Sequence, residues 1–105
     1  MSVQELVKQL NDTIETHIDI IWQEEWFDFY DQAAQLYEQV KGENSAVDET
    51  AEKMMSVLDE GGDAPSQEEW YDICDAVCAM SVELYNAGII GSEILDAYPD
   101  LYQYA

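Results

Sequence analysis

The stretch VQELVKQLNDTIETHIDIIWQEEWFDFYDQAAQLYEQV, residues 3–40, decides the class of fold. It contains no Gly or Pro, and its apolar side chains recur at the spacing of an amphipathic helix. One straight helix of this length would measure about 57 Å, whereas a compact chain of this size has a radius of gyration of ~13 Å. We therefore predict an elongated or kinked segment, broken at Ile18–Ile21, where Asp19 can cap a second helix. The stripe expected to face the core is Val3, Leu6, Val7, Leu10, Ile14, Ile18, Ile21, Trp22, Trp26, Phe29, Ala33, Leu36, Tyr37 and Val40.

Capping residues and glycines divide the rest of the chain into further helices. Three pairs have the spacing of a capping box at a helix start: Ser2–Glu5, Ser45–Asp48 and Ser66–Glu69. The later helices are expected over residues 45–60, 66–87 and 93–98. No segment alternates for long enough to predict a strand, and no internal repeat has a solenoid period. The sequence therefore predicts an all-α fold, a small bundle of four to five helices that forms one acidic domain over residues 1–105.

Acidic residues dominate the composition. Asp and Glu total 24 against three lysines and no arginine, which gives a net charge of −21. Binding to nucleic acid or to an anionic membrane surface requires Lys and Arg, so both are excluded. The chain is nevertheless 48% hydrophobic, unlike a disordered chain. Because it carries neither a secretory segment nor an apolar span of about 20 residues, we expect a cytoplasmic protein.

Few residues are suited to catalysis or metal binding. His17 is the only histidine, and with Cys74 and Cys78 it offers at most three soft ligands where a structural zinc site usually has four. One acidic loop resembles a calcium-binding loop, but Ala64 stands where a glycine is needed and Trp70 where a bidentate Glu is needed. We therefore predict that the protein is not an enzyme and holds no metal or cofactor.

Acidic stripes of one sign are the feature that points to a function. Like charges three or four residues apart on a helix repel each other, yet this sequence repeats them. A net charge of −21 equals that of roughly 36 Å of DNA duplex, about ten base pairs. We predict that the two densest stripes act together as phosphate surrogates toward a basic nucleic-acid-binding protein. Their carboxylates are Glu24, Glu25, Asp28, Asp31, Glu68, Glu69, Asp72 and Asp75.

The acidic composition and helical pattern of the chain resemble those of a known protein family. Its short acidic helical character, its lack of arginine and the run EEWFDFYD at residues 24–31 are similar to phage-encoded DNA-mimic inhibitors of the anti-restriction (overcome-classical-restriction) type. The resemblance covers composition and architecture over the whole chain, and no aligned motif carries a functional residue over. It implies an anti-restriction or anti-CRISPR protein that evades host defence by blocking the DNA or RNA site of a host nuclease or effector, and it leaves a homodimer open.

Two other functions fit the same charge. An acidic immunity protein or antitoxin would neutralise a basic toxin without copying the geometry of DNA. A helical adaptor with a merely solvated acidic surface, including one adapted to high salt, would need only that the acids point outward. Competition by duplex DNA and by raised salt distinguishes mimicry from the solvated or adaptor alternative.

Aromatic residues beside the acids bear on the mode of binding. Phe27 and Tyr30 extend the apolar surface around much of one helix, which predicts either central burial, the interpretation we favour, or a second contact such as a dimer interface. Tyrosines that prove exposed beside carboxylates would anchor a partner, because Tyr is enriched at interface hot spots. The candidate anchors are Tyr30, Tyr71, Tyr98, Tyr102 and Tyr104.

Overall fold

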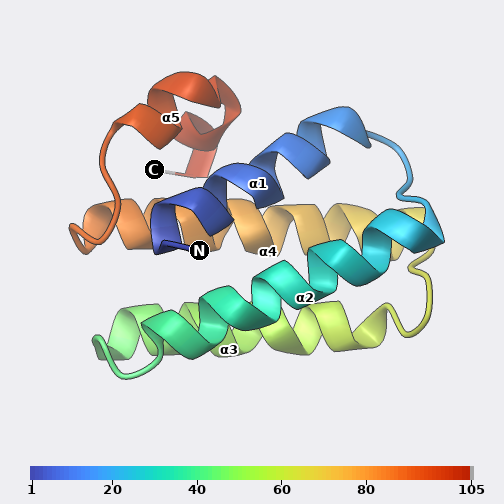
Figure 1. Ribbon diagram of the computed structural model, residues 1–105, viewed down its shortest axis with the longest axis horizontal. Helices are drawn as coiled ribbons and strands as arrows, with labels where there is room; N and C mark the ends of the chain where they lie inside the picture. The colour runs from blue at the N-terminus through green and yellow to red at the C-terminus, as the bar shows by residue number, and fades with distance from the viewer. Residues whose placement is uncertain (105) are drawn as a thin grey trace.

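Six helices and no strand make up residues 1–104, the part of the chain that the computed structural model describes (Figure 1). The four long helices are α1 (Val3–Thr16), α2 (Gln23–Val40), α3 (Ser45–Glu60) and α4 (Gln67–Asn86). The short helix α5 (Glu93–Ala97) and the 3₁₀ helix η1 (Pro99–Tyr104) follow them. The predicted all-α class is confirmed.

The four long helices form a ring in which consecutive helices are antiparallel (Figure 1). Helix α1 packs against α2 and α4, and α3 packs against the same two helices, so α2 and α4 lie on a diagonal of the ring. The hairpins α1–α2 and α3–α4 turn at the same end of the bundle (Figure 1). The radius of gyration is 12.5 Å and the extents are 32 × 26 × 24 Å, so residues 3–40 fold back on themselves rather than stay elongated.

The predicted break in the first segment is confirmed, but the predicted cap is wrong. Helix α1 ends at Thr16 and α2 begins at Gln23. Trp22 occupies the N-cap position of α2 with an extended backbone and makes no side-chain capping bond. Asp19 does not cap α2; its carboxylate accepts a hydrogen bond of 3.2 Å from the hydroxyl of Tyr71 on α4. A contact with a distant helix therefore holds this connection.

Two residues of the predicted core stripe are exposed, contrary to prediction. Ile18 keeps 72% of its surface exposed and Trp22 keeps 68%. Both lie in the connection between α1 and α2, where the chain leaves the helical phase that placed them inside. Ile21, in the same connection, is buried as predicted.

The other two predicted helix N-caps are confirmed, and the one predicted for α3 is wrong by one residue. The boxes predicted at Ser2 and Ser66 are both present. Helix α3 is capped by Asn44 rather than Ser45: the Asn44 side-chain oxygen accepts a bond of 2.9 Å from the backbone N–H of Val47. Asn and Ser are comparable N-caps, so the local pattern did not distinguish them.

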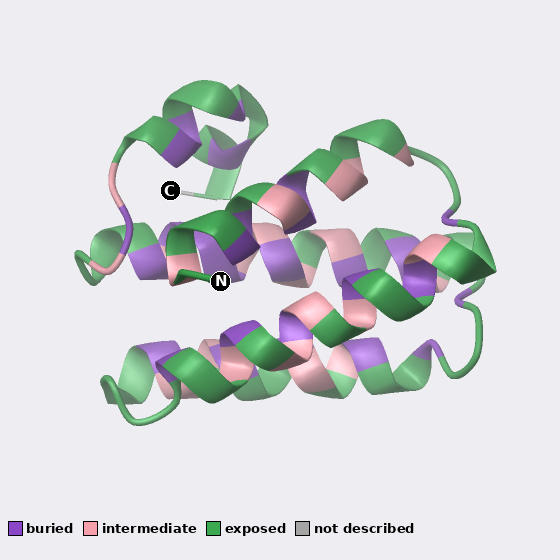
Figure 2. Cartoon of the chain, in the orientation of Figure 1, coloured by how far each residue is buried: buried purple, intermediate pink, exposed green. Residues whose placement is uncertain are grey.

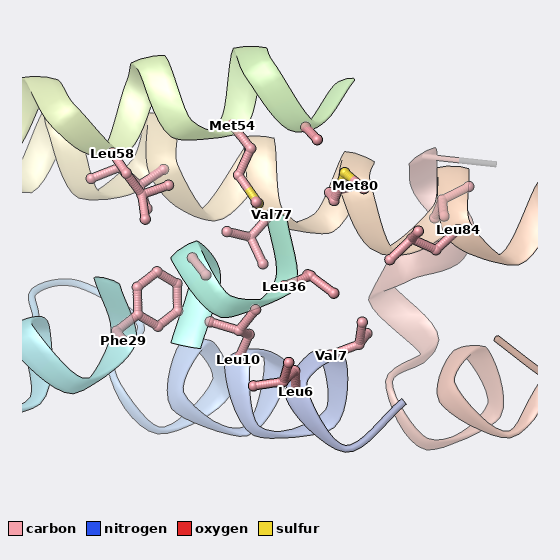
Figure 3. Packing of buried hydrophobic residues seen from close by; sticks show 14 of the residues in the cluster. Leu6, Val7, Leu10, Phe29, Leu36, Met54, Leu58, Val77, Met80 and Leu84 are labelled. Atoms are coloured by element: carbon pink, nitrogen blue, oxygen red, sulfur yellow. The ribbon is translucent and has the colours of Figure 1, made fainter. Parts of the chain in front are cut away.

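Apolar side chains from all four long helices converge on one core (Figure 3). Its aromatic centre spans the diagonal of the ring, because the Trp70 ring of α4 meets two rings of α2. The centroid of Trp70 lies 6.4 Å from that of Trp26 and 5.1 Å from that of Phe29, both edge-on. Such pairs contribute about 0.5–1.5 kcal/mol beyond the apolar area they bury.

The two buried tryptophans also fix the two interhelical connections reciprocally. Trp26, in the first hairpin, donates its indole N–H to the carbonyl oxygen of Gly62 in the second, over 3.0 Å. Trp70, in the second hairpin, donates its indole N–H to the carbonyl oxygen of His17 in the first, over 2.7 Å. Gly61 lies against the Trp26 ring, where an added Cβ would stand 2.9 Å from a ring carbon. Each hairpin thus holds the turn of the other.

Replacing either buried tryptophan with phenylalanine should destabilise the fold. We expect Trp70→Phe and Trp26→Phe each to lower the free energy of unfolding by about 1–3 kcal/mol, because a carbonyl loses its donor and a cavity remains. The matched control Trp22→Phe, at an exposed position, should change it by less than about 0.5 kcal/mol. Urea denaturation followed by circular dichroism measures the free energy of unfolding of all three variants. Equal decreases for Trp22→Phe and Trp70→Phe would contradict a stabilising role for the reciprocal contact.

Candidate partner-binding surface

The structure places six of the eight predicted carboxylates at exposed positions. Helix α2 carries Glu24, Asp28 and Asp31, and α4 carries Glu68, Asp72 and Asp75. On each helix the three carboxylates stand at positions i, i+4 and i+7, one face of a helix. Each helix therefore presents one acidic stripe to solvent, which we call the α2 stripe and the α4 stripe.

The other two predicted carboxylates, Glu25 and Glu69, are half-buried. Glu69 completes the N-terminal capping box of α4, where its Oε1 accepts a bond of 2.8 Å from the backbone N–H of Ser66. Hydrogen bonds from the backbone and hydroxyl of Ser66 lower the pKa of Glu69. Glu25 has its Oε2 buried, with no hydrogen-bond partner among residues 1–104. Neither carboxylate is presented in the way that a phosphate group is.

The α2 and α4 stripes do not converge on one face. Exposed segments follow the outer sides of the helices, and buried segments alternate with them on the sides that face the core (Figure 2). Because α2 and α4 are diagonal in the ring, their outer sides point in opposite directions. The molecule therefore carries one acidic stripe on each of two opposite sides.

A short internal repeat underlies the two stripes. Residues 23–31 read QEEWFDFYD and residues 67–75 read QEEWYDICD, identical at six of nine positions. The repeat opens α2 and α4, and it contains both core tryptophans as well as both stripes. The two copies are 44 residues apart, but the repeat covers only nine residues and occurs only twice, so it does not form a solenoid array. Direct comparison of the two helix starts would have found it from the sequence.

An aromatic side chain lies beside each stripe. Phe27 precedes Asp28 of the α2 stripe, and its counterpart Tyr71 precedes Asp72 of the α4 stripe. Phe27 is 53% exposed and Tyr71 is 42% exposed. The favoured prediction of central burial is thus wrong for Phe27, because α2 turns Trp26 and Phe29 inward and leaves Phe27 on the solvent side.

Tyrosine hydroxyls serve as the main side-chain donors to carboxylates. The residues described contain two ion pairs, Lys8–Asp12 at 2.9 Å and Lys41–Glu38 at 2.7 Å. Five of the seven tyrosines donate to an aspartate instead. The pairs are Tyr30–Asp59, Tyr71–Asp19, Tyr98–Asp12, Tyr102–Asp96 and Tyr104–Asp75. Neutral donors therefore bind part of the negative charge in a chain that has almost no cations.

Of the five candidate tyrosine anchors, three are exposed and two are buried or half-buried. Tyr71, Tyr102 and Tyr104 are exposed beside carboxylates, as an anchor requires. Tyr98 is buried, with its hydroxyl bonded to Asp12 of α1, so it is not an anchor. Tyr30 is half-buried.

Two grooves flank α4 on either side of Asp75. One, of about 620 Å³, lies between α3, α4 and η1 and includes Lys53. The other, of about 590 Å³, lies between α1, α4 and the start of η1 and has no basic lining residue. Asp75 lines both grooves and accepts a hydrogen bond of 2.6 Å from the hydroxyl of Tyr104.

Metal-binding and nucleophilic side chains are not grouped. Residues 1–104 contain no cluster of three or more His, Cys, Asp or Glu side chains arranged to hold a metal ion. Cys74 and Cys78 are half-buried on α4. Burial raises the pKa of Cys74 to about 12 and that of Cys78 to about 11, which disfavours the reactive thiolate. His17 is also half-buried and lies in the connection that Trp70 holds.

Comparisons with known proteins give no indication of the function. The chain matches no known protein family, no curated protein and no solved structure. Among the described helices, none has the length and apolar character needed to cross a membrane. Function is therefore inferred from the two stripes, the exposed aromatic side chains beside them and the grooves beside α4.

The tyrosine–aspartate bonds should make the fold sensitive to alkaline pH. Hydrogen bonding to Asp59 and Asp75 raises the pKa of Tyr30 and Tyr104 above the ordinary value of 10.0, and burial followed by the bond to Asp12 raises that of Tyr98. A raised pKa in the folded state contributes stability that is complete below the unfolded pKa and is lost as pH rises through the folded pKa.

We therefore expect the free energy of unfolding to fall as pH rises above about 10. Tyr98→Phe should be less stable than the parent at neutral pH but should lose less stability above about pH 10, because one of the titrating hydroxyls is gone. Urea denaturation at a series of pH values, with tyrosinate absorbance recorded in parallel, gives both quantities. A free energy of unfolding that is constant or rises over this range would contradict the interpretation.

Proposed function

We propose that the protein is a DNA-mimic inhibitor that occupies the nucleic-acid-binding site of a host defence protein, such as a restriction enzyme, a CRISPR effector or a related nuclease. The observation that carries the proposal is the pair of acidic stripes on opposite sides of a body with a net charge of −21. The inhibitor binds stoichiometrically and catalyses no reaction. It acts in the cytoplasm of the host cell, where a phage or mobile element would express it.

The density of charge along the molecule supports this proposal. A duplex with the same charge would be roughly 36 Å long, since DNA carries one charge per about 1.7 Å of its axis. The longest extent of the protein is 32 Å. A basic cleft would therefore meet a similar charge over a similar length, and its long-range field would steer the protein as it steers DNA.

The opposite placement of the stripes also fits this function. A duplex displays phosphates on both sides of its axis, and an enzyme that closes around it contacts both. Carboxylates at positions i and i+4 of one helix are separated by a rise of about 6 Å along the axis, a regular row of negative charge. One stripe would face each wall of such a cleft.

Exposed Phe27 and Tyr71 favour a second candidate function. A duplex backbone has no exposed aromatic group beside its row of phosphates, whereas protein interfaces commonly use an aromatic anchor surrounded by polar residues. An acidic immunity protein or antitoxin that covers a basic toxin would use these side chains in that way. In that case replacing Phe27 and Tyr71 by Ala would weaken capture of the partner as much as reversing the stripe charges does.

Reversing charges in both stripes should abolish binding. Glu24, Asp28, Glu68 and Asp72 are exposed, and we expect their joint replacement by Lys to weaken capture of the target by about 100-fold or more. Glu24→Ala alone should weaken it by less than about fivefold, because an exposed charge contact contributes little by itself. The measurement is the retention of nucleic-acid enzymes from a bacterial lysate at low salt, with circular dichroism to verify folding.

The matched control reverses four exposed acids outside the stripes. Replacing Glu43, Glu49, Glu52 and Glu93 by Lys changes the net charge by the same amount and should leave most of the binding intact. If the two quadruple variants lose target binding equally, the total charge determines binding and the position of the stripes does not. Complete loss from a single Glu24→Ala change in a folded protein would replace the two stripes with one specific site.

A further inference from the structure

The groove between α1 and α4 differs from the acidic surface around it. Its lining includes the apolar side chains of Ile14 and Ile18 from the first hairpin, with Tyr71 and Cys74 from α4. Ile18 is 72% exposed, so this apolar part of the lining is accessible from solvent. The volume of about 590 Å³ is within the range of about 300–1,000 Å³ that is usual for ligand pockets.

The internal repeat places different side chains at equivalent positions of α2 and α4. Position 74 of the second repeat corresponds to Tyr30 of the first. Tyr30 is half-buried, and its hydroxyl donates to the carboxylate of Asp59 at the end of α3. In the second repeat the smaller Cys74 lines the groove together with Glu15 of α1. A cysteine thus lines the groove at the position where the first repeat has a tyrosine.

The charged residues of the groove lining have one sign. They are Glu15, Asp75 and Asp100, and no lysine is among them. A lining of apolar side chains and carboxylates is complementary to a helix with one apolar side and flanking lysines or arginines. The lining of the groove beside α3 has mixed charge, because Lys53 joins three carboxylates there.

We propose that the α1–α4 groove binds a basic amphipathic helix of the partner protein, with apolar side chains of that helix on Ile18 and Cys74. The inference rests on the proposed function for the basic character of the partner. It adds a contact that nucleic acid does not make, so that the inhibitor remains bound where screening by salt would release a purely ionic mimic.

The test uses a synthetic peptide of roughly 14 residues, about four helical turns, with leucines on one side and lysines on the other. A second peptide has the same composition with the leucines scattered. By fluorescence anisotropy we expect the protein to bind the amphipathic peptide about tenfold more tightly than the scattered one. No target enzyme is present, so this result is independent of whether the protein inhibits a nuclease.

Two variants assign the preference to the groove. Cys74→Tyr introduces the residue type of position 30 and should fill the groove, and Ile18→Ser removes an exposed apolar side chain of the lining that is not part of the core. Both should bring the two peptides to equal affinity while leaving the affinity for the scattered peptide unchanged. The control Ile20→Ser changes an exposed residue of the same connection that does not line the groove, and it should keep the preference.

Three results would overturn the proposal. Equal affinity of the parent protein for both peptides would mean that charge alone acts. A preference that persists in both Cys74→Tyr and Ile18→Ser would place the contact elsewhere. Self-association of the parent in sedimentation velocity that Cys74→Tyr abolishes would assign the groove to a second copy of this chain.

Discussion

The reciprocal hydrogen bonds of Trp26 and Trp70 are the constraint on which the rest of the structure depends. Each indole N–H donates to a carbonyl oxygen in the opposite hairpin's connection, and the two rings meet edge-on inside the core near that end of the bundle. This crossing fixes the end of the bundle at which α2 and α4 begin. Because the two stripes also begin there, the contact that closes the core sets the placement of the surface charge.

Surface repulsion is the opposing constraint. A net charge of −21 on a body of this size favours expansion, and two lysine–carboxylate pairs offset little of it. The chain relies on a core to which all four long helices contribute and on tyrosine hydroxyls that donate to aspartates. Tyrosine supplies a donor without supplying a positive charge, so the stripes keep the negative potential that a basic partner would recognise.

The sequence predicted the helices well because their signals are local. Ser2 and Ser66 cap helices through residues three positions away, and the apolar period places most of the core. The exposure of Trp22 could not be predicted, since the connection before it is fixed by Trp70, far along the chain. The sequence shows which acidic residues form the stripes. It does not show that the stripes lie on opposite sides of the molecule, because this depends on the order of the helices in the ring. The repeat at residues 23–31 and 67–75 can be seen in the sequence, and it predicts that the two stripes occupy equivalent positions on two helices.

The most direct test of mimicry is whether the partner can hold the protein and duplex DNA at the same time. The apparent dissociation constant of the purified partner for this protein is measured at increasing concentrations of duplex. We predict that it rises in proportion to the duplex concentration, with no ternary complex, because both occupy one basic site. A constant affinity, with a complex that contains partner, protein and DNA together, would contradict the proposed function.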